Sequence, residues 1–189
     1  MKRIFFVLLA LCLGLTVAFA SAAISKNNKV ILLISEQNIS GPQRAWWASQ
    51  INLSAVEQKV AQKLIEQGFI VLEPSDLTKT IKRDRAFSLV DISEDKSVKL
   101  GRLSKADYIV LGKAVASSGA RVPQSSMVSC FANVTAKLIR AKDGKVLAYL
   151  DASGNSAHMD VVSGGREALG NAGSDLANRV INALKEEAK

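Results

Sequence analysis

One thiol and one imidazole are the side chains of this sequence best suited to nucleophilic chemistry. Cys130 is the only cysteine outside the first twenty-two residues, and His158 is the only histidine. A thiol beside an imidazole base can act as the nucleophile of a cysteine hydrolase. Cys130, however, alternates with apolar Val128 and Ala132 along a predicted strand, where a small thiol usually fills the core and lacks the exposure that makes it reactive. We therefore expect no enzyme and no catalytic residue, and keep a Cys130 hydrolase as an alternative.

Metal and cofactor chemistry find little support in the composition. One histidine, one cysteine and scattered carboxylates give no ligand spacing for zinc or copper. Gly164-Gly165 precedes a predicted helix and could approach a phosphate, but no P-loop or dinucleotide pattern accompanies the pair. We expect a flexible turn at these glycines, and no metal or cofactor.

Two adjacent tryptophans are better candidates for binding. Trp46 and Trp47 lie in a polar segment between two predicted elements. Neighbouring side chains of an extended loop point in different directions, so one ring can anchor the loop while the other meets a partner or stacks on a sugar. The alternative is that both rings only cover the edge of a sheet.

A second candidate surface comes from the alternation between Val128 and Ala152. The even-numbered positions are small or apolar and are expected to face the core. The opposite face then carries an apolar and aromatic stripe, which marks a partner-binding surface or a contact with another part of the chain. The predicted partner-binding residues on this stripe are Phe131, Ile139, Leu147 and Tyr149.

The length of the turn in this hairpin follows from the requirement that inward residues of one strand pair with inward residues of the other. A two-residue Asp143-Gly144 loop would place inward residues opposite outward ones. A three-residue loop, with Gly144 in the left-handed conformation, pairs Leu138 with Ala148 and Ile139 with Leu147.

The helices and strands that must position these residues alternate irregularly along the chain. An aliphatic strand over 29–35 is followed by a helix over 54–67, which starts with a Ser54–Glu57 capping box and ends at Gly68. A short strand over 69–72 completes a right-handed βαβ unit with parallel strands. A helix from about Asp91 to Lys105, a strand over 107–115, the hairpin and a long helix from Gly164 to Lys185 come next. We predict an α+β fold of β-α-β-α-β-β-β-α order, a mixed sheet with helices mainly on one face.

The first residues indicate where the protein works. A basic end, an apolar run over 4–19 and an Ala-x-Ala pattern are typical of a cleaved secretory signal peptide. We expect a signal over residues 1–22, cleaved after Ala20, Ala22 or Ala23, and a single domain over 23–189 that does not span a membrane and is soluble in the periplasm. The net charge of +8 is scattered and no nucleic-acid motif is present, so no nucleic acid is expected as a partner.

With the elements placed, the chain resembles an envelope-assembly domain. The stretch Lys105 to Gly112, the hairpin 132–147 with its Asp143-Gly144 turn, and the glycine-rich start of the last helix are similar to the domain shared by CsgG, the amino-terminal domain of TolB and the middle domain of FlgT. The Trp46-Trp47 loop and the Gly68 to Val71 step look most like the FlgT branch. The resemblance implies a non-enzymatic periplasmic accessory protein that docks onto envelope, secretion or flagellar assembly proteins. A peptidoglycan- or glycan-binding module using Trp46 or Trp47 is the alternative.

Overall fold

The computed structural model describes residues 27–39, 41–42, 53–72 and 105–187. The predicted signal peptide, Trp46, Trp47 and nearly all of the helix predicted from Asp91 lie outside these residues. The predictions that rest on them therefore stay predictions.

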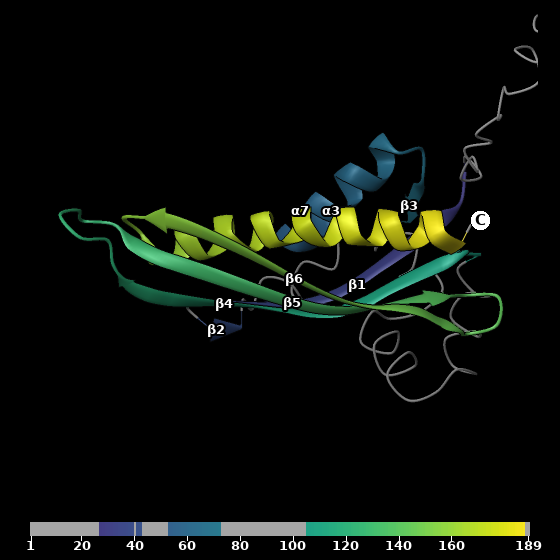
Figure 1. Cartoon of the computed structure of the whole chain (residues 1–189), viewed down its shortest axis with the longest axis horizontal. Coiled ribbons are helices and arrows are strands. Elements are labelled where there is room, and N and C mark those ends of the chain that lie inside the picture. Colours follow the sequence, from purple (N-terminus) through teal and green to yellow (C-terminus); the bar gives the residue numbers. More distant parts are fainter. Residues whose placement is uncertain (1–26, 40, 43–52, 73–104, 188–189) are drawn as a thin grey trace, which may run out of the picture.

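The described residues form a mixed sheet with two helices on one of its faces (Figure 1). The strands are β1 (Lys29–Asn38), β2 (Gly41–Pro42), β3 (Ile70–Leu72), β4 (Tyr108–Arg121), β5 (Val128–Arg140) and β6 (Val146–His158), and the helices are α3 (Ala55–Glu66) and α7 (Val161–Glu187). The strand order is β2-β1-β4-β5-β6, with β3 also paired to β1. β1 is parallel to β3 and β4, whereas β4, β5 and β6 are antiparallel. The predicted α+β class is confirmed.

The first βαβ unit forms as its local sequence predicts. The Ser54 hydroxyl accepts a hydrogen bond from the Glu57 amide at 3.2 Å, and the Glu57 carboxylate accepts one from the Ser54 amide at 3.0 Å. Gly68 has a φ of 88°, the left-handed conformation that ends helices. Ile70 then pairs with Lys29 in a parallel ladder.

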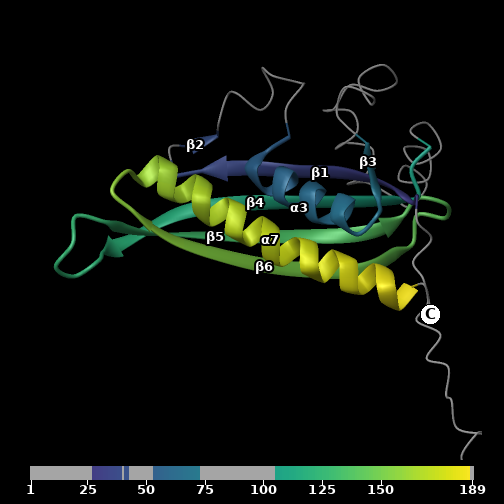
Figure 2. The same ribbon diagram turned by 90° about the horizontal axis from the view of Figure 1, so that it is seen from above.

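One end of the molecule is built from fewer strands than the other. The pairing of β1 with β4 ends at Gln37 and Val115, whereas β4 continues along β5 to Arg121 and Val128. Figure 2 shows that α3 lies over β1, while α7 crosses β5 and β6 and reaches beyond α3. We call this three-stranded part, with the beginning of α7, the narrow end. Its strand segments are 116–121, 128–133 and 153–158.

The core lies in two layers on opposite faces of the sheet. The larger layer packs α3 and α7 against the inward side of the strands, with Leu64, Leu138, Leu169 and Leu176 all fully buried. A smaller cluster lies on the other face. Its buried members are Ile31, Leu33, Ile109, Leu111, Ile139 and Ala141.

The β5–β6 hairpin corrects part of the predicted register. Gly144 is left-handed, with a φ of 78°, and Leu138 pairs with Ala148 as predicted. The Arg140 amide, however, donates to the Lys145 carbonyl at 2.9 Å, so the loop covers 141–144 and is one residue longer than predicted. Because Ile139 then pairs with Val146, a bulge falls at Leu147.

The last helix begins earlier than predicted. α7 starts at Val161, so Gly164 and Gly165 lie within its first turns and are buried instead of forming a flexible turn. A Cβ added at Gly164 would lie 2.6 Å from the Cys130 sulfur. The space beside the glycine pair is thus filled by protein. A phosphate could not approach the pair, so the phosphate-binding interpretation of Gly164-Gly165 is wrong.

Candidate interaction face

The face of the sheet away from the helices carries the candidate site. The pairings of β4 with β5 and of β5 with β6 place its residues in rows across three strands. We call the rows beyond the small core cluster the outer face. From the wide part of the sheet to the narrow end, its rows are Lys137 and Tyr149; Lys113, Thr135 and Asp151; Val115, Asn133 and Ser153; and Ser117, Phe131 and Asn155.

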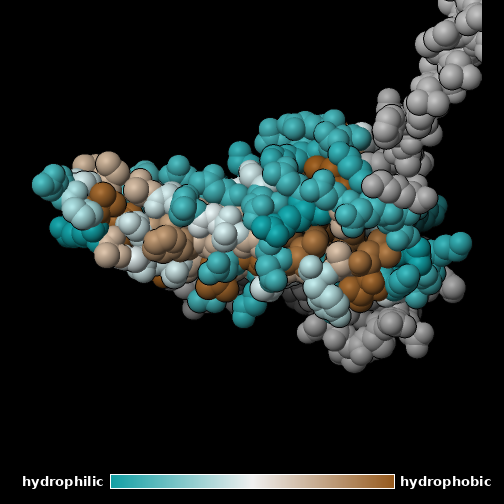
Figure 3. All heavy atoms as spheres, in the orientation of Figure 1, coloured by the Kyte–Doolittle hydropathy of each residue, from teal (hydrophilic) through white to brown (hydrophobic). Residues whose placement is uncertain are grey.

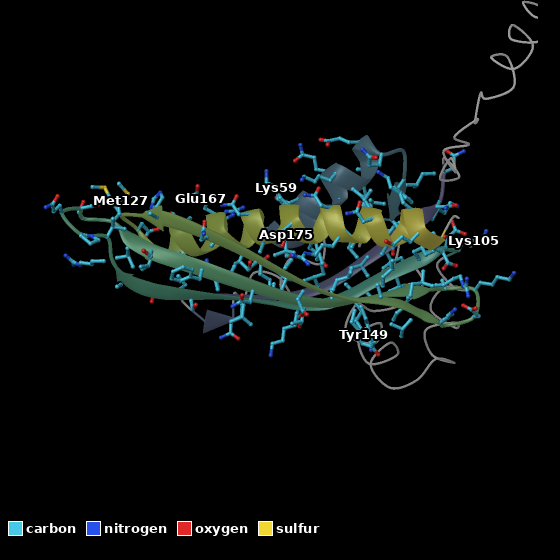
Figure 4. All side chains as sticks on the ribbon, viewed as in Figure 1. Lys59, Lys105, Met127, Tyr149, Glu167 and Asp175 are labelled. Carbon is cyan, nitrogen blue, oxygen red and sulfur yellow. The ribbon has the colours of Figure 1, made fainter. Side chains whose placement is uncertain are left out.

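Tyr149 is the most exposed large hydrophobic side chain described on this face. Its exposed fraction is 80%, although it lies within a regular strand and pairs with Lys137. Figure 4 shows it on the side of the sheet opposite α7. Such a ring in mid-strand has no packing role in the described residues, and a phenol offers both apolar area and a polar tip to a partner.

Phe131 is the second exposed aromatic residue, with an exposed fraction of 45%. Its ring lies over Gly119 of β4, because a Cβ built at Gly119 would be 2.6 Å from a ring carbon. One side of the ring is therefore held by the strand, while the rest of it is open.

Ile139 and Leu147, the other two predicted stripe residues, do not belong to the outer face. Ile139 pairs with Ile109, which pairs with Ile31, and this apolar row buries Ile139 to 2% exposure. The bulge turns Leu147 toward the helix side, where it packs on the larger core layer. The predicted exposure of Ile139 is wrong, and Leu147 is half-buried against the helix side instead of lying on the outer face.

Cys130 and His158 are near each other but are not arranged as a nucleophile and a base. The Cys130 sulfur is buried and lies 3.8 Å from the carbonyl oxygens of Val128 and Val161. The Nδ1 atom of His158 accepts the Asp160 amide at 3.0 Å in the turn before α7. This geometry gives the thiol a core role and the imidazole a turn role; the absence of enzyme activity remains a prediction.

Side chains from the helices cover backbone groups at both edges of the sheet. The buried Glu57 carboxylate accepts the Ile34 amide of β1 at 2.8 Å. On β6, Asp175 accepts the Ser153 amide at 3.4 Å, and Asn171 donates to the Asn155 carbonyl at 2.8 Å. Covered edge positions cannot pair with a foreign strand. At these positions the helices therefore compete with the addition of a foreign strand.

A second carboxylate, Glu36, lies beside the start of α3. It accepts the Val56 amide at 3.0 Å. Burial raises the pKa of Glu36, and the nearby Glu57 adds to that rise, while hydrogen bonds from Val56 and Ser54 lower it. This group links the fold to pH without contributing to the outer face.

The described residues carry neither a cluster of metal ligands nor a helix suited to a membrane. Within the described ranges, no group of three or more histidine, cysteine, aspartate or glutamate side chains converges in a way that could hold a metal ion. Neither helix of the described part is long and apolar enough to cross a membrane.

Comparison with known proteins shows the fold. No protein-family model matches the chain, and no curated protein matches it in sequence. The hypothetical protein CT253 from Chlamydia trachomatis is similar in structure, with a TM-score of 0.53, 9% identity, and coverage of 86% of this chain and 98% of that one. At this identity the likeness extends to the fold alone.

Two further solved structures resemble the chain more distantly. The lipoprotein GNA1162 from Neisseria meningitidis has a TM-score of 0.43 and 15% identity over 82% of this chain and 99% of that one. The PelC dodecamer from Paraburkholderia phytofirmans has a TM-score of 0.40 and 16% identity over 85% and 89%. At these identities both likenesses extend to the fold alone. CsgG, TolB and FlgT are not among the structures named here, so that narrower resemblance stays a prediction.

Part of the outer face could not be found from the sequence. Asn133 and Asn155 appear there as ordinary polar residues of alternating strands, and Asn171 comes from a helix. A hollow of about 600 Å³ brings them together with Phe131. Only the register of three strands and the placement of α7 reveal that grouping.

Proposed function

We propose that this protein is a non-enzymatic accessory protein of the bacterial envelope, which docks onto other envelope or secretion proteins through the part of the outer face around Tyr149. The observation that carries the proposal is the 80% exposure of this aromatic ring within a regular strand. The predicted signal peptide supports the envelope location.

The surroundings of Tyr149 indicate what kind of protein surface would fit. Lys137 pairs with it directly, and Lys113 lies in the next row with Thr135. Asp151 is the acidic residue of that row. An aromatic anchor with a polar rim is typical of a binding hot spot, and the lysines favour a partner with acidic groups at its rim.

Photo-crosslinking in the producing cells tests this function. A photoreactive amino acid at position 151 lies on the outer face beside Tyr149, and the same amino acid at position 59 lies at an exposed position of α3, on the opposite side of the sheet. We expect discrete adducts with an envelope protein from position 151 and not from position 59. Equal adducts from both positions, or none from 151, would contradict docking through this face.

The glycan module that uses Trp46 or Trp47 and the Cys130 hydrolase remain alternatives of different kinds. The two tryptophans lie outside the described residues. The hydrolase is disfavoured by the burial of the thiol and by the hydrogen bond that the His158 ring accepts within its own turn.

A further inference from the structure

A shallow groove of about 600 Å³ lies at the narrow end. Its walls come from three strands and one helix, and the residues share a neutral character. They are Ser117, Phe131, Ala132, Asn133, Ser153, Gly154, Asn155 and Asn171. The volume falls in the range of about 300 to 1,000 Å³ that small-ligand sites occupy.

The lining is chemically selective although none of it is charged. Each asparagine side chain offers two N–H donors and a carbonyl acceptor in one plane, and each serine hydroxyl both donates and accepts. Planar amides of this kind can bond two neighbouring hydroxyl groups at once, or an acetamido group, on a sugar ring. From these groups and the adjacent aromatic ring, we propose that the groove binds a neutral oligosaccharide.

Phe131 supplies the apolar part of such a site. Its ring lies over Gly119, which has no side chain to displace it, and 45% of the residue is exposed. A pyranose ring has one face of C–H groups, which packs well on an open aromatic surface. Because the ring is already held by the strand, little side-chain freedom is lost on binding.

Asn171 is also held in place before a ligand arrives. Its Nδ2 donates to the Asn155 carbonyl at 2.8 Å, so the amide is fixed beside the groove at the edge of β6. Gly154, between Ser153 and Asn155, allows α7 to approach β6 closely: a Cβ there would collide with the backbone of Ala168 and Ala172. The groove is therefore preorganised by the packing of helix on strand.

The same features disfavour other ligands. A phosphate, a nucleic acid or an acidic sugar would require cations, and the described residues that line the groove include no lysine or arginine. A peptide held by side-chain anchors would require apolar pockets, whereas the groove offers a single aromatic ring. Figure 3 shows pale and tan residues of intermediate hydropathy along much of the narrow end, whereas the wide end carries strongly hydrophilic and strongly hydrophobic patches side by side.

Titration of the isotope-labelled full-length protein with neutral oligosaccharides tests this proposal. The probes are chitotetraose, maltotetraose and cellotetraose, with a galacturonate tetramer as the charged control. We expect at least one neutral probe to bind with a Kd of about 1 mM or below, and to shift the amide signals of Gly119, Asn133 and Asn155. The charged control should bind at least about tenfold more weakly.

Matched variants separate recognition from folding. Phe131→Leu keeps an apolar cover over Gly119 but removes the aromatic surface, and should weaken binding about tenfold or more, whereas Phe131→Tyr should bind as the wild type does. Asn133→Ala, at an exposed position, should weaken binding severalfold without changing the melting temperature. Tyr149→Ala should leave sugar binding unchanged.

Several results would overturn the inference. One is the absence of shifts with all three neutral probes at about 10 mM, far above the expected Kd. Another is a set of shifts confined to residues outside the groove. The third is sugar binding that Phe131→Leu leaves unchanged. Because Tyr149 lies outside the groove, failure here and failure of protein docking give separate results.

Discussion

Tyr149 and Ile139 occupy equivalent positions in the alternation of the hairpin, yet one is exposed and the other is buried. Ile139 continues an apolar row through Ile109 to Ile31, so β1 and β4 extend its surroundings. Tyr149 lies on the edge strand, where the row ends. The sequence predicts which side of a strand a residue occupies, but exposure depends on which strands lie beside it. The alternation therefore predicts the same exposure for Phe131, Ile139 and Tyr149, and only the pairing partners, Ser117 beside Phe131 and Ile109 beside Ile139, separate the exposed residues from the buried one.

At the same scale, a substitution of Cys130 tests whether its thiol only fills the core. Cys130→Ala removes one small buried group, so we expect a loss of about 1 kcal/mol or less in unfolding free energy, measured by urea denaturation. Docking and sugar binding should be unchanged. Rapid labelling of the native wild-type thiol by a polar reagent would show that it is accessible and would contradict this account.

Glu36 predicts a dependence of stability on pH. Burial raises the pKa of Glu36 in the folded protein above its ordinary value of 4.5. As the pH falls through the raised folded pKa toward about 4.5, the folded state gains a proton before the unfolded state does, so this group favours folding increasingly. Above the raised pKa, the buried charge opposes folding.

The matching variant is Glu36→Gln, which keeps an acceptor for the Val56 amide and cannot ionise. Its unfolding free energy relative to the wild type should be higher at pH 7.5 than at pH about 4.5. Denaturation at both pH values measures this difference. A difference that stays constant, or that grows toward acid, would show that Glu36 does not carry the linkage.

At the scale of elements, local signals predicted more than long-range ones. The capping box of α3 and Gly68 depend on residues within a few positions of one another, and both formed as predicted. The start of α7 was misplaced because Gly164 and Gly165 read as a turn, whereas they face Cys130 and Asn38 across a close helix–strand contact. A glycine that permits packing and a glycine that breaks a helix are indistinguishable in one sequence.

The contact between α7 and β6 gives a paired prediction. In Gly154→Ala, the new Cβ would collide with the α7 backbone at Ala168 and Ala172, so we expect a loss of more than about 2 kcal/mol. In Gly170→Ala, the new Cβ would lie 3.8 Å from two Lys59 side-chain carbons, and the helix would gain about 0.5 to 1 kcal/mol. Thermal and chemical denaturation should thus shift in opposite directions for the two variants. Similar losses for both would disprove the close approach at Gly154.

At the scale of the whole molecule, the outer face has two regions at different distances along the sheet. The row with Tyr149 lies toward the wide part, and the row with Phe131 lies in the narrow end, where β1 no longer pairs with β4. The α+β class and the single-face placement of the helices followed from the order of the elements. The narrow end did not, because it depends on β4 continuing well past the segment predicted as a strand.

The amino-terminal segment predicts the location of the entire protein. If residues 1–22 are a cleaved signal, the mature chain starts between Ser21 and Ile24 and is recovered in the soluble periplasmic fraction. Intact-mass measurement of the purified protein identifies the start directly. A mass that retains Met1, or one that carries a lipid adduct, would require a different route to the envelope.

The central claim is that the outer face around Tyr149 binds a partner and is not a hidden part of the core. The most direct measurement combines the yield of photo-crosslinked adduct from position 151 with the melting temperature, for the wild type, Tyr149→Ala and Leu150→Ser. Tyr149→Ala should lower the adduct yield about tenfold, within the range expected for a hot-spot residue, and leave the melting temperature unchanged. Leu150→Ser, on the buried side of the same strand, should lower the melting temperature. Unchanged adduct yield in Tyr149→Ala, or a loss of stability as large as that of Leu150→Ser, would contradict the claim.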